Sequence, residues 1–181
     1  MNAYESFKIV TANLLETKPV TDFGVADIVI ISGFSRQCFY KFFRDKYDVV
    51  NSVFLDRNSA LDKVISEFEE IDVILRICCE QYREKASFYR NACLYTGQNS
   101  SIELLRDISF KKHHDAIIKA RGGIPLTAEE SFILRKVSTN ITSSLREYLL
   151  TGCFEPIDWM VNYEIGIFPD FLYEAYKYKL E

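Results

Sequence analysis

Residues that break helices are scarce in this chain, and this scarcity constrains its fold more than any other feature. Seven glycines and four prolines are spread over 181 residues. A fold rich in β-strands needs a turn signal every ~8–12 residues, and this chain has too few glycines and prolines to supply them. Apolar residues instead recur every three or four positions, which is the period of a helix. We therefore predict an all-α fold.

The helical pattern divides the chain into short segments followed by longer ones. The short segments cover residues 4–16, 25–32 and 35–43, and a fourth begins at Lys46. The later segments cover residues 61–83, 88–95, 102–120 and 127–151, and two more begin at Pro156 and Pro169. This change in length predicts an N-terminal domain over residues 1–57 and a C-terminal helical domain over residues 58–181.

Residues 18–50 have the pattern of a helix-turn-helix, because Gly33 lies in a tight turn between two short helical pieces. In the next piece, Phe39 and Phe43 fall at inward-facing positions. Four basic residues and one acid lie between positions 35 and 47, although the whole chain has a net charge of −4. The positive charge is therefore concentrated where a recognition helix would meet DNA.

The run of residues 28–49, IVIISGFSRQCFYKFFRDKYDV, resembles the DNA-binding signature of the TetR family of regulators. The glycine turn, the pair Phe39-Tyr40 and the pair Asp45-Lys46 carry the resemblance. Residues 88–100, FYRNACLYTGQNS, are similar to the branch of that family that activates dihydroxyacetone kinase operons. The resemblance implies a transcription regulator that binds a near-palindromic operator in double-stranded DNA as a homodimer.

The resemblance also assigns the DNA contacts to six residues, which are Arg36, Gln37, Cys38, Tyr40, Lys41 and Lys46. Arg36 and Gln37 lie at the start of the recognition helix, residues 35–43, which is the end that enters the major groove. Arginine pairs well with guanine and glutamine with adenine. Tyr40 and Lys41 fit phosphate-contacting positions, and Lys46 is expected to hold a phosphate at the start of the next helix.

Several positions in the same segment differ from the residues that the family usually has. Gly24 and Cys38 replace residues with a hydroxyl group, and Phe42 replaces a histidine. Fewer phosphate contacts imply weaker DNA binding with a flatter salt dependence. Ile30 and Ile31 stand where the family normally has charge, which indicates contact with another domain or with a partner. The alternative function is therefore a TetR-like protein with weakened or lost DNA binding that acts through a protein partner or as a small-molecule-binding helical protein.

The segment of residues 127–151 carries one long apolar row, made of Ile133, Val137, Ile141, Leu145 and Leu149. Such a row suits either the buried face of a central helix or the interface of a helical dimer, and we predict a dimer interface. Aromatic residues are plentiful from residue 82 onward, and they include Phe132, Trp159 and Tyr163. These residues either line a cavity for a small-molecule effector or fill a core, and the sequence leaves both open.

No arrangement of residues suggests catalysis, so we predict neither an enzyme nor a cofactor or metal. His113 and His114 are neighbours on a helix and point about 100° apart, which suits a solvated face better than a metal site. The five cysteines lack metal-type spacing and suit free thiols in a reducing cytoplasm. Because the chain shows neither a signal peptide nor a membrane span, we expect a cytoplasmic protein with no membrane partner.

Overall fold

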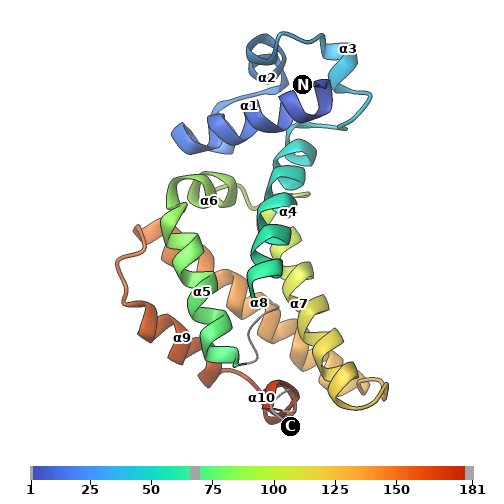
Figure 1. The fold of residues 1–181 in the computed structure, drawn as a ribbon, viewed down its shortest axis with the longest axis vertical. Helices are drawn as coiled ribbons and strands as arrows, with labels where there is room; N and C mark the ends of the chain where they lie inside the picture. Colours follow the sequence, from blue (N-terminus) through green and yellow to red (C-terminus); the bar gives the residue numbers. More distant parts are fainter. Residues whose placement is uncertain (1, 66–69, 178–181) are drawn as a thin grey trace. The chain divides into compact units, whose positions relative to one another are not determined.

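A computed structural model describes residues 2–65 and 70–177, and over these residues the chain is helical, without strands (Figure 1). The prediction of an all-α fold is confirmed. The α-helices are α1 (Ala3–Thr17), α2 (Val25–Ser32), α3 (Arg36–Phe39), α4 (Lys46–Ile65), α5 (Ile71–Glu84), α6 (Ala86–Cys93), α7 (Ser101–Ala120), α8 (Ala128–Thr151), α9 (Ile157–Gly166) and α10 (Asp170–Lys177). A short 3-10 helix, η1 (Val20–Asp22), precedes α2. None of the described helices is long and apolar enough to cross a membrane.

The chain folds as two compact units. Unit 1 consists of Met1–Ala60 and Lys85–Leu104, so it holds α1, α2, α3, α6, most of α4 and the first turn of α7. Unit 2 consists of Leu61–Glu84 and Leu105–Glu181, so it holds α5, α8, α9, α10 and most of α7. Unit 1 thus includes a second stretch of chain beside the N-terminal residues. The domain boundary after residue 57 stays a prediction.

The residues at the helix ends make the capping interactions that their side chains predict. The Ser35 hydroxyl accepts a hydrogen bond from the Cys38 N–H at 3.1 Å and so caps α3. Thr127 and Glu130 form a reciprocal capping box at the start of α8, with bonds of 2.8 and 3.1 Å. Gly152 ends α8 with a φ of 94°, in the left-handed region that glycine adopts without strain.

The helical pattern over residues 61–83 belongs to two helices. Helix α4 reaches Ile65 and α5 begins at Ile71, while residues 66–69 lie outside the described part of the chain. The prediction of one helical segment over residues 61–83 was therefore wrong, because residues 61–65 are the end of α4 and residues 71–83 belong to α5. Both helices place apolar residues at the same period, so the pattern alone does not mark a break.

The apolar row on α8 is largely taken up by the core of unit 2. Val137, Leu145 and Leu149 are each at most 9% exposed, and Ile133 and Ile141 pack against the same core. A side chain that is buried within one subunit is not accessible to a second one. Three of the five side chains are therefore packed within the subunit, whereas Ile133 and Ile141 are half-buried, and the dimer interface on this row stays a prediction.

His113 is another buried residue of unit 2, where the sequence predicted a solvated helix face. Its Nδ1 lies 2.7 Å from the Tyr176 hydroxyl, and its ring packs edge-on against Phe168. Burial lowers the pKa of His113 to about 4, so the imidazole is neutral at physiological pH. No group of three or more potential metal ligands occurs among the described residues.

Candidate nucleic-acid interface

A cluster of aromatic rings in unit 1 fixes α3 against α1. Phe39 is fully buried, and its ring centroid lies 5.2 Å from that of Phe7 and 5.5 Å from that of Phe43. Phe43 in turn stacks on Tyr4 with centroids 5.2 Å apart. The prediction that Phe39 and Phe43 face inward is confirmed. With its inner face held in this way, α3 presents its other side chains outward.

Regular α-helix covers only Arg36–Phe39, which is shorter than the predicted recognition helix over residues 35–43. The backbone continues through overlapping turns, in which the N–H groups of Phe42 and Phe43 both bond to the Phe39 carbonyl. Arg36, Gln37, Tyr40 and Lys41 are exposed, and Cys38 is half-buried. Five of the six predicted contact residues therefore lie together on one short segment.

Tyr40 and Arg36 support each other on the outer surface of this segment. The Arg36 guanidinium lies 6.0 Å from the centre of the Tyr40 ring, within the range of a cation–π interaction. The edge of Tyr40 rests against buried Phe39, with ring centroids 5.5 Å apart. The ring thus links the exposed guanidinium to the aromatic cluster and restricts the positions that Arg36 can take.

Lys46, the sixth predicted contact, is engaged inside unit 1. Its ammonium group donates hydrogen bonds to the carbonyls of Val20 and Phe23, each at 2.8 Å. Burial lowers the pKa of Lys46. Two of its three N–H donors are therefore used to hold η1 and the entry to α2 against the start of α4. No pattern in the sequence indicated these bonds, because the two carbonyls lie 26 and 23 residues away.

Two acidic residues reduce the positive charge at this surface. The Gly24 N–H donates to the Asp27 carboxylate at 2.7 Å, so a carboxylate occupies the start of α2, where an anion would otherwise bind. The Arg44 guanidinium donates to Asp48 at 3.4 Å, one helical turn along. The spacing of four residues was a signal for this second pair. Arg36 and Lys41 remain as exposed cations on the segment.

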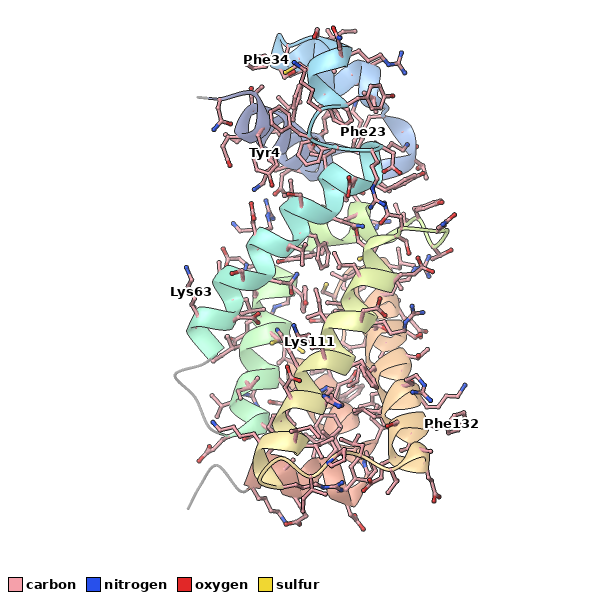
Figure 2. The ribbon with its side chains drawn as sticks, turned by 90° about the vertical axis from the view of Figure 1, so that its right-hand side faces the viewer. Tyr4, Phe23, Phe34, Lys63, Lys111 and Phe132 are labelled. Carbon is pink, nitrogen blue, oxygen red and sulfur yellow. The ribbon has the colours of Figure 1, made fainter. Side chains whose placement is uncertain are left out.

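Large apolar side chains are also exposed near α3. Ile30 is 77% exposed and Ile31 is 59% exposed. Phe34, which is labelled in Figure 2, follows them at the turn. Its ring packs against Phe7, with centroids 5.7 Å apart. Phe42 is 47% exposed and contacts the edge of Tyr4. The surface around α3 is therefore both basic and apolar.

These helices define a helix-turn-helix, with α2 and α3 joined at a left-handed Gly33 and braced by α1 and α4. The fold of the whole chain is similar to that of a solved structure, described as the dihydroxyacetone kinase operon activator DhaS. The two share 14% sequence identity, the match covers 96% of each chain, and the TM-score is 0.59. The chain therefore has a TetR-like fold. No protein-family model matches the sequence, and no curated protein matches it significantly.

Proposed function

We propose that this chain is a transcription regulator that binds double-stranded DNA through residues 35–43. The observation that carries the proposal is the outward display of Arg36, Gln37 and Lys41 on a short helix held by a rigid aromatic cluster. Arg36 and Gln37 suit recognition of base edges in the major groove, and Lys41 suits a phosphate contact. The similarity of the whole fold to an operon activator supports the same function.

Selection of random duplexes by the purified chain, followed by sequencing, tests this proposal. We expect enrichment of one near-palindromic sequence whose half-sites are about one helical turn apart, roughly 34 Å, because a homodimer presents two recognition helices. The sequence recovered in this way is called the selected duplex below. A pool that remains random after repeated rounds at low salt would refute the proposal.

In this proposal Lys46 positions the helix-turn-helix, and it does not bind a phosphate. Lys46→Met should weaken binding to the selected duplex because η1 and α2 lose their hold on α4. The salt dependence should keep its wild-type slope. Lys41→Met should instead reduce the slope by about 0.9 for each phosphate that is no longer neutralised. Titrations over a range of salt concentrations separate the two roles, and an equal decrease of slope in both variants would contradict this one.

The homodimer is proposed to form through the outer faces of α8 and α9. Phe132 on α8 is 54% exposed and projects from the helix in Figure 2, and Trp159 and Tyr163 on α9 are 68% and 47% exposed. The Tyr163 hydroxyl donates to the Asn140 side chain at 3.4 Å, so the two outer faces are adjacent. Exposed aromatic side chains at the centre of a patch are typical anchors of protein interfaces.

Trp159→Asp should convert the dimer to a monomer, because the interface would then bury an unpaired charge. Sedimentation velocity at several protein concentrations measures the change. Ile124→Asp is the matched control, since Ile124 is also exposed, at 63%, but lies in the loop between α7 and α8. The proposed interface is wrong if both variants sediment like the wild type, or if Ile124→Asp dissociates the chain equally.

A second candidate function is regulation through a protein partner. Ile30 and Ile31 favour it, because two neighbouring isoleucines that are more than half exposed are unusual on a surface that only binds DNA. Asp27 at the start of α2 favours it as well, since its carboxylate repels a phosphate. A selection experiment that yields a sequence only in the presence of another protein would support this candidate over unaided DNA binding.

A further inference from the structure

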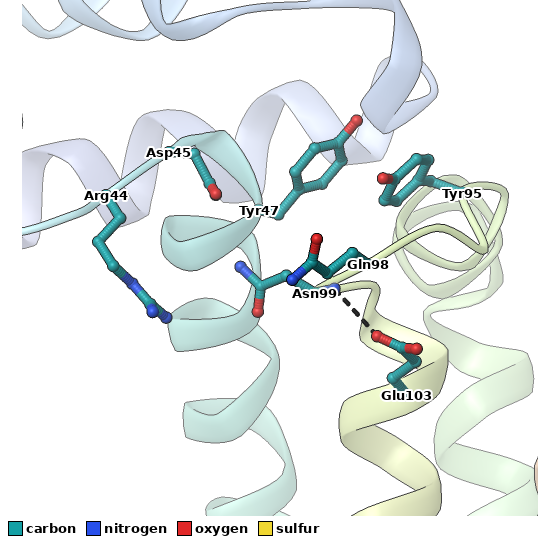
Figure 3. A pocket seen from close by; sticks show the side chains of 7 residues that line it. All are labelled: Arg44, Asp45, Tyr47, Tyr95, Gln98, Asn99 and Glu103. Carbon is teal, nitrogen blue, oxygen red and sulfur yellow. Dashed lines mark hydrogen bonds between the residues drawn. The ribbon is translucent and has the colours of Figure 1, made fainter.

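A polar hollow of about 580 Å³ lies in unit 1 (Figure 3). Its walls are the first turn of α4, the loop that precedes α7 and the first turn of α7. The side chains that line it are Asp45, Tyr47, Tyr95, Gln98, Asn99 and Glu103, with Arg44 at its edge. Its volume is within the range of small-molecule sites in proteins.

The loop wall of the hollow is held rigidly by a buried hydrogen-bonded hub. Asn51, on α4, donates to the backbone carbonyl and the side-chain oxygen of Asn99, at 3.0 and 3.2 Å. The Ser101 hydroxyl donates to Asn51 at 3.0 Å, and the Asn99 N–H donates to Glu103 at 2.9 Å. These bonds hold Asn99 in the left-handed region, with a φ of 62°. A wall fixed in this way is organised before any ligand arrives.

A stacked pair of aromatic rings forms another part of the wall. The ring centroids of Tyr47 and Tyr95 are 4.2 Å apart, with the ring planes inclined by 14°. Gly97 permits this arrangement, because a Cβ atom at that position would collide with the Tyr95 side chain. The rings bring the first turn of α4 and the loop before α7 together on one side of the hollow.

The lining groups offer both donors and acceptors to a ligand. One carboxylate oxygen of Asp45 caps α4 by accepting a hydrogen bond from the Asp48 N–H at 2.8 Å. One carboxylate oxygen of Glu103 accepts a hydrogen bond from the Asn99 N–H. The other oxygen of each carboxylate has no hydrogen bond within the described chain, and neither has the Gln98 amide. The Asn99 side-chain NH₂ adds a further donor. Hydroxyl groups both donate and accept, whereas ammonium groups only donate and phosphate oxygens only accept.

The charges around the hollow also favour a neutral ligand, because the two carboxylates disfavour an anion and their own surroundings weaken the attraction of a cation. Asp45 and Glu103 stand at the starts of two helices of 20 residues each, whose N-terminal dipoles offset part of their negative charge. Arg44 is paired with Asp48, so it adds little positive charge. We propose that this hollow is a binding site for a small neutral polyhydroxylated molecule, held by the amides of Gln98 and Asn99 and the carboxylates of Asp45 and Glu103.

NMR titration of the full chain tests the site with three probes of six carbons each: sorbitol, which is neutral, hexane-1,6-diamine, which is cationic, and adipate, which is anionic. We expect sorbitol to shift the side-chain amide signals of Gln98 and Asn99 along a saturating curve. The observation does not depend on DNA, so it can succeed or fail independently of the proposed function. A linear response to sorbitol, or saturation with the diamine or adipate instead, would overturn the proposal.

A second test compares sorbitol binding by Gln98→Ala and by the wild type. Binding is followed by the side-chain amide signal of Asn99. The variant should weaken sorbitol binding by about 2- to 10-fold, the effect of removing one hydrogen bond. Thr96→Ala is the matched control, because Thr96 is exposed in the same loop and does not line the hollow. Equal affinity in wild type and Gln98→Ala, or equal weakening in both variants, would place the binding elsewhere.

Discussion

Arg36→Ala is expected to lower the affinity for the selected duplex by about 10- to 100-fold for each half-site, the effect of removing one bidentate arginine–base pair. Arg36 is exposed at the start of α3, and within unit 1 its guanidinium makes a cation–π interaction with Tyr40. The fold should therefore tolerate the change, and the melting temperature should stay within a degree or two of the wild type. The weakening should be confined to one base pair in each half-site, because phosphate contacts carry no sequence information.

Arg90→Ala is the matched control for this variant. Arg90 is an exposed arginine of unit 1 on α6, and its replacement removes the same charge from the chain without altering α3. Fluorescence anisotropy with the selected duplex measures both variants. If Arg36→Ala binds as tightly as Arg90→Ala and keeps the same base preferences, direct recognition by Arg36 is wrong.

Glu164→Gln is expected to change the stability of the chain most strongly above neutral pH. Glu164 lies on α9, is 5% exposed, and has one carboxylate oxygen with no hydrogen-bond partner in the described structure. Burial raises the pKa of Glu164 from 4.5 to about 7. The folded chain therefore holds a proton on this group over a pH range in which the unfolded chain has released it.

The sign of the effect follows from this difference in proton binding. The contribution of Glu164 to stability is fully present below pH 4.5 and is lost as the pH rises toward 7. The shift corresponds to roughly 3 kcal/mol of unfolding free energy between these limits. Glutamine cannot ionise, so Glu164→Gln should remove this pH dependence and be more stable than the wild type at alkaline pH.

Urea unfolding at several pH values measures the effect as the difference between variant and wild type, which cancels the contribution of the other titrating groups. Glu129→Gln is the control, because it makes the same chemical change at a glutamate that is exposed at the start of α8. A Glu164→Gln curve parallel to that of the wild type would show that the carboxylate finds a partner or water when it ionises.

Capping residues and the helical period of apolar residues were enough to predict the helices and the aromatic core of the helix-turn-helix. Ser35, Gly33 and Thr127 mark helix ends through bonds to residues only a few positions away, so the sequence itself records these contacts. Phe39 and Phe43 were predicted to be buried because they recur at the helical period. The length of the recognition helix was overestimated, because the period continues into the turns at residues 40–43.

The functional details that the sequence missed depend on contacts between distant residues. A lysine at a helix start suggests an anion site, yet Lys46 donates to carbonyls more than 20 residues away. The hub at Asn51 joins residues 48 positions apart. On α8, both the buried row and the outer face that carries Phe132 contain apolar residues, and only packing distinguishes them. Similar limits apply to His113, whose partner Tyr176 lies 63 residues away.

The central claim is that residues 35–43 bind DNA with sequence specificity, despite the engaged Lys46 and the carboxylate of Asp27. The most direct measurement compares the affinity of the wild-type chain for the selected duplex with its affinity for a scrambled duplex of the same composition. At about 150 mM salt, where nonspecific attraction is largely screened, we predict a preference of at least about 1,000-fold. Equal affinity for the two duplexes would contradict the account and would favour regulation through a protein partner.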